Sequence, residues 1–142
     1  MQTQAQGFRK IETEKLTLDV FDASENSFGV ASVIVSGKTD AILIDAQFTL
    51  ADAETIAKKI KDSGKKLTAI YISHGDPDFY FGLEVFKKYF PDVTAYASPA
   101  TIEHIKATAQ KKLEIWGGRL GKAITSNVLL PQVLQGNSFD LE

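Results

Sequence analysis

The sequence predicts an α/β fold built around a mixed β-sheet. Short apolar runs rich in β-branched residues recur along the chain, which is typical of strands. Between two of these runs, residues 41–46 and 67–73, lies a stretch with helical periodicity. Strand, helix and strand in this order form a βαβ unit, in which the strands are parallel and the crossover is right-handed. Upstream of the unit, alternating residues and a hairpin-type turn predict further strands.

The first expected elements lie between residues 15 and 46. Residues 15–23, "KLTLDVFDA", alternate apolar and polar side chains and predict an edge strand with one buried face. Residues 30–37 are β-branched and close at Gly37 in a turn. Residues 41–46, "AILIDA", are continuously apolar, as in a strand that is covered on both faces. We expect residues 1–14 to be a flexible leader and residues 15–142 to form the domain.

A helix is expected between the two parallel strands. Thr49, with Asp52 three residues later, resembles a capping box, and Gly64 is a suitable C-terminal stop. Apolar residues recur between them at helical spacing, namely Ala53, Ile56, Ala57 and Ile60. The next buried strand, residues 67–73, completes the unit.

The rest of the chain predicts two more helices and a strand. Residues 83–91 form a short helix that stops before Pro91, and residues 93–98 form a strand. Ser98 and Pro99 then suit the N-cap and first position of a longer helix.

An apolar stripe on this longer helix includes Trp116, which we therefore expect in the core. Gly117 and Gly118 end or hinge the helix, so that residues 117–127 form a loop. Residues 128–130 and 138–142 resemble parts of further strands, and the last pattern stops unfinished, so the domain is expected to be incomplete at its C-terminus.

Composition limits the classes of function. The chain has 142 residues, which suits one domain, and 44% hydrophobic with 24% charged residues is ordinary for a globular protein. A net charge of −2 argues against an electrostatic grip on nucleic acid or on anionic membranes. The chain has no cysteine, which excludes disulfides and thiolate metal sites.

The sequence leaves the cellular compartment open. It contains no apolar run as long as a transmembrane helix and no signal-peptide core near its N-terminus. A cytoplasmic location, or a periplasmic one after removal of a signal, fits equally.

The stretch "SHGDPD" follows the buried strand 67–73, where open α/β sheets place their ligands. In an extended segment His74, Asp76 and Asp78 project to one side, so that an imidazole and two carboxylates converge on a cation. Such a set suits zinc, and its oxygens also suit manganese or iron. The alternative is an ordinary turn, in which the aspartates cap backbone N–H groups and Pro77 fixes φ.

Two further residues have open or structural interpretations. Asp45 ends the strand 41–46 on the same rim, and either supports the His74 loop or caps its own loop. His104 lies within a helix, off its apolar stripe, and is expected to be a solvated surface residue. The sequence has no phosphate-binding, dinucleotide-binding or serine-nucleophile motif.

The order of these motifs resembles the metallo-β-lactamase superfamily over residues 28–135. An aspartate at a strand end matches Asp45, and the HxHxDH motif of that family reads HGDPDF from His74 to Phe79. The resemblance implies one half of an αββα sandwich, a mixed sheet with helices on one face. It also implies metal binding by His74, Asp76 and Asp78, with Asp78 catalytic and Asp45 supporting.

This sequence departs from the family pattern at three places. Asp76 stands where the family has its second histidine, and Phe79 replaces the last one, which puts a binuclear site in doubt. No histidine follows His104, whereas the family supplies further ligands from its second half. The chain would therefore lack a C-terminal half, or two copies would pair to rebuild the sandwich.

Two hypotheses follow for function. The first is a divalent-metal hydrolase-like domain, most simply zinc-dependent, that acts on an ester, amide or thioester with weak or no turnover by this chain alone. The second is a non-catalytic binding or dimerisation module on the same scaffold. The sequence does not identify a small-molecule substrate.

Overall fold

The computed structural model describes residues 7–141. Its strands are β1 (Gly7–Glu12), β2 (Thr17–Asp22), β3 (Ala31–Ser36), β4 (Asp40–Ile44), β5 (Lys66–Tyr71), β6 (Thr94–Ala97) and β7 (Gln132–Val133). Its α-helices are α1 (Leu50–Ser63), α2 (Pro77–Tyr80), α3 (Leu83–Tyr89) and α4 (Pro99–Leu120). Short 3-10 turns are η1 (Glu25–Ser27) and η2 (Gly121–Ala123).

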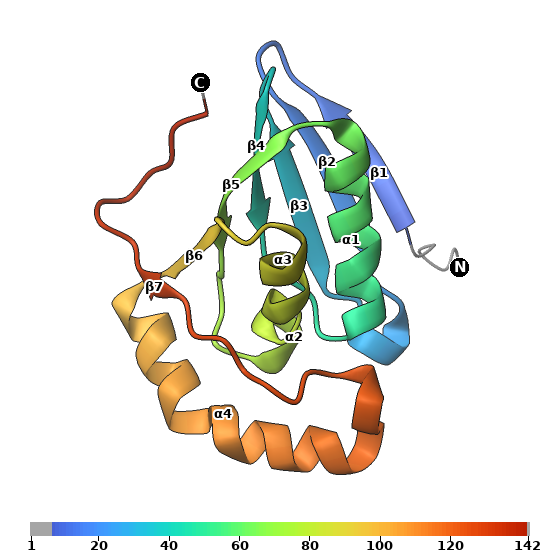
Figure 1. Ribbon diagram of the computed structural model, residues 1–142, viewed down its shortest axis with the longest axis vertical. Coiled ribbons are helices and arrows are strands. Elements are labelled where there is room, and N and C mark those ends of the chain that lie inside the picture. Colours follow the sequence, from blue (N-terminus) through green and yellow to red (C-terminus); the bar gives the residue numbers. More distant parts are fainter. Residues whose placement is uncertain (1–6, 142) are drawn as a thin grey trace.

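The strands form one mixed sheet of seven, ordered as they occur in the chain. Neighbours from β1 to β4 are antiparallel, and neighbours from β4 to β7 are parallel. Figure 1 shows α1 and α3 on one face of this sheet, while α4 crosses the end of the molecule at which the chain leaves β5 for α2. The predicted α/β fold with helices on one face is confirmed.

Helix α1 begins and ends where the sequence predicts. The Thr49 hydroxyl accepts a hydrogen bond from the Asp52 N–H at 3.3 Å, and Gly64 ends the helix at φ 73°, in the left-handed conformation that glycine tolerates. Ile56 and Ile60 are buried on its inner face. Helical periodicity and both caps agree here, so local and tertiary preferences specify the same helix.

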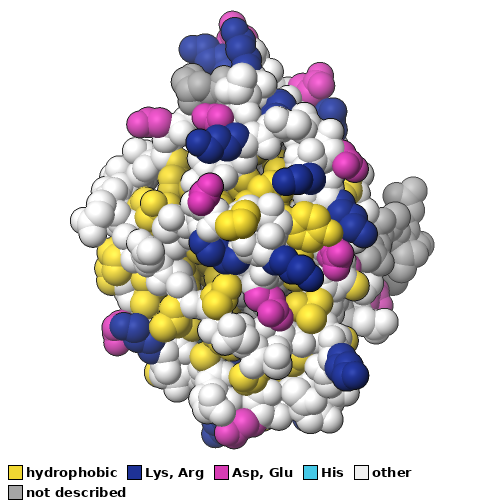
Figure 2. Space-filling model, in the orientation of Figure 1, with side chains coloured by type: hydrophobic (Ala, Val, Ile, Leu, Met, Phe, Trp, Pro, Cys, Tyr) yellow, Lys and Arg dark blue, Asp and Glu magenta, His cyan; other side chains and the backbone are white. Residues whose placement is uncertain are grey.

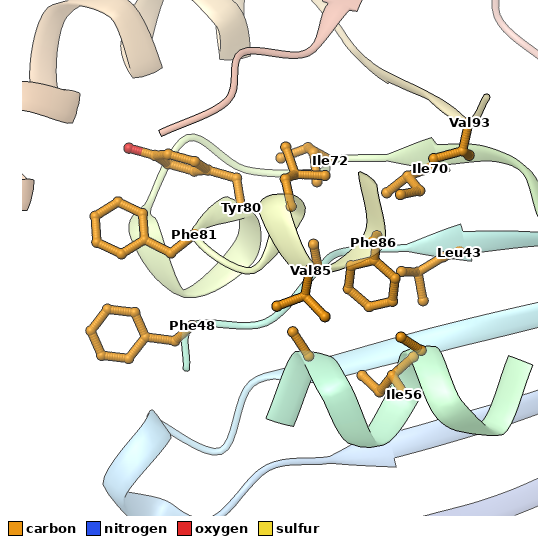
Figure 3. Close-up of a cluster of buried hydrophobic side chains, with 14 of the residues drawn as sticks. Leu43, Phe48, Ile56, Ile70, Ile72, Tyr80, Phe81, Val85, Phe86 and Val93 are labelled. Carbon is orange, nitrogen blue, oxygen red and sulfur yellow. The ribbon is translucent and has the colours of Figure 1, made fainter. Parts of the chain in front are cut away.

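The core lies between the sheet and the helices α1 and α3. Figure 3 shows Ile56 of α1, Leu43 of β4 and Phe86 of α3 pointing toward one another. Leu43 and Phe86 have no exposed surface. Burial of side chains of this size contributes about 1.5–3 kcal/mol each. This packing holds β4 and β5 in place, and with them the loops that follow these two strands.

The opposite face of the sheet is also apolar. Its cross-strand neighbours form two rows across the sheet, Ile11–Leu18–Val35–Ile42–Ala69 and Val20–Val33–Ile44–Tyr71. Phe139 packs against Tyr71 and Tyr96 with ring centroids 5.9 and 5.8 Å apart, respectively. A cavity of about 1070 Å³ remains between this segment and the sheet. We call these two rows the open face.

The N-terminal prediction is wrong in two respects. Residues 7–12 of the expected leader form β1, which pairs along its length with β2, and residues 1–6 lie outside the described residues. The strand predicted for residues 15–23 is therefore not at the edge, because β1 covers it. The polar composition of β1 conceals a strand whose residues 9–12 are exposed.

The C-terminal prediction also needs correction. Helix α4 continues through Gly117 and Gly118 to Leu120, and ends only where Gly121 adopts φ 53°. Trp116, directly before the two glycines, packs against Phe28 and Phe48 outside α4, and these contacts favour the helical turn that carries it. Trp116 itself is partly buried and packs on the border of the core. Residues 128–130 and 138–141 are not strands, and β7 lies between them.

The surface carries mixed charge. In Figure 2, Lys and Arg side chains alternate with Asp and Glu side chains and with small hydrophobic groups, so this face has no continuous basic area. Among the described residues, no helix is both long enough and apolar enough to cross a bilayer.

Candidate metal and ligand site

Two loops meet at the carboxyl ends of β4 and β5. Asp45 follows β4 and Ser73 follows β5, and the Asp45 N–H donates to the carbonyl of Tyr71 at 2.8 Å. The two carboxylate oxygens of Asp45 accept from the Ser73 N–H at 2.7 Å and from the Ser73 hydroxyl at 2.6 Å. Asp45 therefore fixes the beginning of the loop that carries His74.

This hydrogen bonding also determines the tautomer of His74. The Ser73 hydroxyl lies 2.8 Å from Nδ1 of His74 and has a single proton, which it donates to Asp45. Nδ1 must therefore carry a proton and donate it to Ser73. In the neutral ring, Nε2 is then left with its lone pair on an exposed side chain. A metal or a proton can bind at that nitrogen.

Asp45 keeps this position at an energetic cost. Its backbone has φ 66°, which is uncommon for a residue with a side chain, and its side chain is buried. Burial raises the pKa of Asp45, and the two hydrogen bonds from Ser73 oppose that rise. A strained, buried carboxylate that holds a neighbouring loop is typical of functional sites.

The other predicted donors are arranged differently from the expectation. Asp76 has extended backbone, but Pro77 begins helix α2, so Asp78 lies within the helix and the i, i+2, i+4 alignment ends at Asp76. Among residues 7–141, no three histidine, aspartate or glutamate side chains are grouped so as to hold a metal ion. The extended geometry predicted for residues 74–78 is therefore wrong beyond Asp76.

Neither aspartate acts as a conventional helix cap. Asp76 is the N-cap residue of α2, yet its side chain makes no capping hydrogen bond. Asp78 accepts from its own backbone N–H, while burial and the charge of Asp76 raise its pKa. The turn interpretation, in which the aspartates satisfy the backbone, accounts for neither carboxylate fully.

His104 is closer to this loop than its sequence position suggests. Its Nε2 lies 3.8 Å from Oδ1 of Asp76, with both side chains about half exposed. The ring packs so closely on Gly75 that a Cβ at that position would lie 2.5 Å from it. His104 is therefore exposed at the surface, as predicted, but the sequence does not predict that it lies beside Gly75 and Asp76.

Sequence reasoning missed Ser73 and His104. A hydroxyl directly before a histidine at a strand end is a usable signal for Ser73. No local signal exists for His104, since its partner is 28 residues away and is reached only through the path of α4.

The donor types suit a divalent cation, although their arrangement does not yet form a complete site. An imidazole nitrogen and carboxylate oxygens are ligands that zinc, manganese and iron accept. One short loop carries His74, Asp76 and Asp78. The ring of Phe79 packs against the His74 ring with centroids 4.5 Å apart. Among residues 7–141 no three donors converge. The three residue types suit a metal, but further ligands would be needed to complete its coordination.

Comparison with known proteins decides the family. The model of the metallo-beta-lactamase superfamily matches residues 26–139. The chain belongs to this superfamily. Its members generally bind divalent metals, often zinc. No curated protein matches the chain.

Solved metallo-beta-lactamases share the fold. DIM-1, in a crystal exposed to ceftazidime, has 19% identity and a TM-score of 0.62, over 99% of this chain and 57% of that one. The enzyme from Hirschia baltica has 14% identity and a TM-score of 0.58, over 94% and 54%. FIM-1 from Pseudomonas aeruginosa, in its mono-zinc form, has 14% identity and a TM-score of 0.58, over 93% and 52%.

These superpositions extend along nearly all of this chain but little more than half of each neighbour. Identities this low support the shared fold and nothing finer. The superfamily domain is therefore shown, and its substrate and activity belong to the proposals below.

Proposed function

We propose that this chain forms the first half of a metal-dependent hydrolase site, with the Ser73–Asp78 loop supplying its initial donors. The observation that carries the proposal is the hydrogen-bonded series Asp45–Ser73–His74. It orients an exposed imidazole with Nε2 available. Hydrogen bonds of this kind to the other ring nitrogen prepare a histidine to bind a metal.

His74, Asp76 and Asp78 would hold the metal in this proposal, with Asp45 as the supporting group. A divalent metal supplies activated water for attack on an ester, amide or thioester carbonyl. Asp78 would also act on the reacting groups, because its carboxylate is half-buried beside the loop and has a raised pKa through burial. The donors are too few for a closed site, so we expect weak or no turnover from this chain alone.

Metal content measures the proposal directly. The purified chain is supplied with zinc, manganese or iron, freed of excess metal and analysed by elemental mass spectrometry. We expect near-stoichiometric metal in the parent and its loss in His74→Ala. His104→Ala is the matched control, since it removes the other histidine and should retain metal. Absence of metal from the parent under all three supplies would reject the proposal.

A second candidate function is assembly without catalysis, favoured by the open face. Its two rows join apolar residues of five strands, and Ile11 at their edge is 43% exposed. Val20, Ile42 and Ala69 are already buried in the single chain, while the other residues of the two rows keep part of their surface in water. A partly exposed apolar face of this kind is typical of an interface. Pairing of two copies through these faces would rebuild a two-sheet sandwich.

Light scattering after size-exclusion chromatography tests this assembly. The parent chain is expected at the molar mass of a dimer, and Ile11→Glu is expected to shift it toward the monomer, because a charge would enter the interface. Glu12→Gln, on the same strand, is the control. A monomeric parent at all concentrations would contradict the second candidate.

A further inference from the structure

A pocket of about 280 Å³ lies beside the loop but faces aromatic rings instead of the histidines. Its walls are Phe28 from the segment after η1, Phe48 from the segment before α1, and Trp116 from α4. Trp116 lies 5.5 Å from Phe28 and 5.3 Å from Phe48 between ring centroids, with edge-to-face geometry in both pairs. The ring centroids of Phe28 and Phe48 are 5.7 Å apart, so the three rings pack against one another and form one aromatic wall of the pocket.

Phe28 is held in this wall at a local cost. It is 58% exposed, and its backbone lies in the left-handed region at φ 61°, which a bulky residue rarely adopts. The exposed ring and the strained backbone both destabilise the chain without ligand. Residues held in such strained conformations cluster at ligand clamps. By contrast, Phe48 is buried and stacks on Phe81, which gives the pocket a rigid side (Figure 3).

Charged groups complete the lining. Asp76 and Asp78 contribute carboxylates, and Lys112 is the cationic residue among the lining groups. Two carboxylates against one ammonium leave a formal negative charge. A neutral apolar ligand would take water from both carboxylates without replacing their hydrogen bonds, and an anion would be repelled by them. An organic cation satisfies both the carboxylates and the ring faces.

Trp116 already contacts a cation of its own helix. The Arg119 guanidinium carbon lies 5.4 Å from the centre of the Trp116 ring. The pocket thus combines π surfaces with carboxylates, the chemistry by which proteins recognise ammonium groups. We propose that the pocket formed by Phe28, Phe48 and Trp116, with Asp76 and Asp78, binds an organic ammonium group. Because the proposed function assigns these two carboxylates to a metal, the ammonium site is tested on the metal-free chain.

The single tryptophan of the chain reports on this pocket. The metal-free chain is titrated with choline and, separately, with 3,3-dimethylbutan-1-ol, which has the same shape without the charge. Trp116 fluorescence and saturation-transfer NMR of the ligand methyl groups are both followed, so that a silent fluorophore does not conceal binding. We expect saturable binding of choline and an affinity for the neutral analogue at least about tenfold lower.

Variants locate the binding. Phe28→Ala should weaken choline binding about tenfold with little effect on folding, because the ring is exposed, and Leu130→Ala, another exposed apolar residue outside the pocket, should not. Asp78→Asn should weaken binding and Asp62→Asn, on α1, should not. Equal affinity for both ligands, no binding by either method, or unchanged binding in Phe28→Ala would overturn the proposal. Because metal is absent throughout, this outcome is separate from that of the elemental analysis.

Discussion

The loops that follow β4 and β5 differ in almost every physical property. Residues 45–48 after β4 are all buried, and Asp45 and Gln47 both have positive φ. In the loop after β5, His74 and Asp76 are exposed. We call residues 45–48 the anchor loop, or anchor, and residues 73–78 the presenting loop, because it carries the candidate functional side chains. Rigid support behind an exposed donor is what positions a group without restricting its access to ligand.

The anchor loop is held by Gly82, directly before α3, and by Ser32 of β3. Gly82 donates its N–H to the carbonyl of Gln47 at 2.9 Å, while the Gln47 side chain donates to the Ser32 hydroxyl at 2.8 Å. The presenting loop is held by Asp45 and by the Ala46 N–H, which donates to the carbonyl of Phe79 at 2.8 Å. The anchor therefore connects the core to the site, and its disruption should affect both.

Substitution of Gly82 is expected to have the largest effect. A Cβ at this position would lie 2.0 Å from the carbonyl oxygen of Ala46 and 2.8 Å from the Cβ of Ala53. Backbone cannot give way as a side chain can, so Gly82→Ala should lower the free energy of unfolding by about 3 kcal/mol or more. Urea denaturation measures it. In Gly117→Ala, where no atom lies within 4 Å, stability should instead rise by up to about 1 kcal/mol. Equal stability of the two variants would contradict this account of the anchor.

Removal of the Asp45 carboxylate should have the next largest effect. Asp45→Ala deletes the acceptor of two hydrogen bonds from Ser73 and leaves the Ser73 N–H without its partner. A loss of about 2–3 kcal/mol is expected in the same denaturation experiment, reduced by the relief of a buried charge. Asp92→Ala, at an exposed position, is the control. A cost below that of the control would show that Asp45 does not hold the presenting loop.

Loss of the Ser73 hydroxyl should change chemistry more than stability. Ser73→Ala removes the group that links Asp45 to Nδ1 of His74 but keeps the backbone hydrogen bond. We expect a cost of about 1–2 kcal/mol. Nitrogen NMR of labelled histidine should show the neutral His74 ring mainly as the Nδ1–H tautomer in the parent. In the variant it should show a mixture of the Nδ1–H and Nε2–H tautomers. An unchanged tautomer would contradict the assigned direction of the hydrogen bond.

The smallest effect is expected at Gly75. The three atoms nearest to a Cβ there all belong to the His104 side chain, which is about half exposed and able to rotate away. Gly75→Ala should therefore change the free energy of unfolding by less than about 1 kcal/mol. The proximity of His104 to Asp76 should be lost, as measured by nuclear Overhauser contacts of the ring. A large loss of stability would mean that the presenting loop is as tightly packed as the anchor.

The sequence predicts the two elements that flank the anchor, β4 and α1, because their signals are local. The apolar run of β4, the capping residues of α1 and the glycine at its end each act within a few residues, and all agree. Strand β1 escapes prediction because its pairing with β2, and not its polar composition, makes it a strand. The length of α4 escapes prediction because tertiary contacts of Trp116 outweigh the low helix propensity of two glycines.

The site is less predictable than the fold. Residue type and position after a strand make His74, Asp76 and Asp78 candidate metal donors in the sequence. The sequence does not predict that Asp78 lies outside the extended alignment of His74 and Asp76. That arrangement arises because Pro77 starts a helix where extended backbone is equally allowed. The aromatic pocket draws its walls from three distant segments, and no pattern within any one of them indicates that they meet.

The strand order of the sheet has a consequence for how the chain is made. Each of the strands β2 to β7 pairs with the strand that precedes it in the chain, so a polypeptide emerging from the ribosome can extend the sheet one strand at a time. Among the described strands, β1 alone has to wait for a partner that is synthesised after it. The open face then grows with each strand from β1 to β5 while the chain is still being made. A nascent chain therefore carries an apolar surface that can associate with other chains.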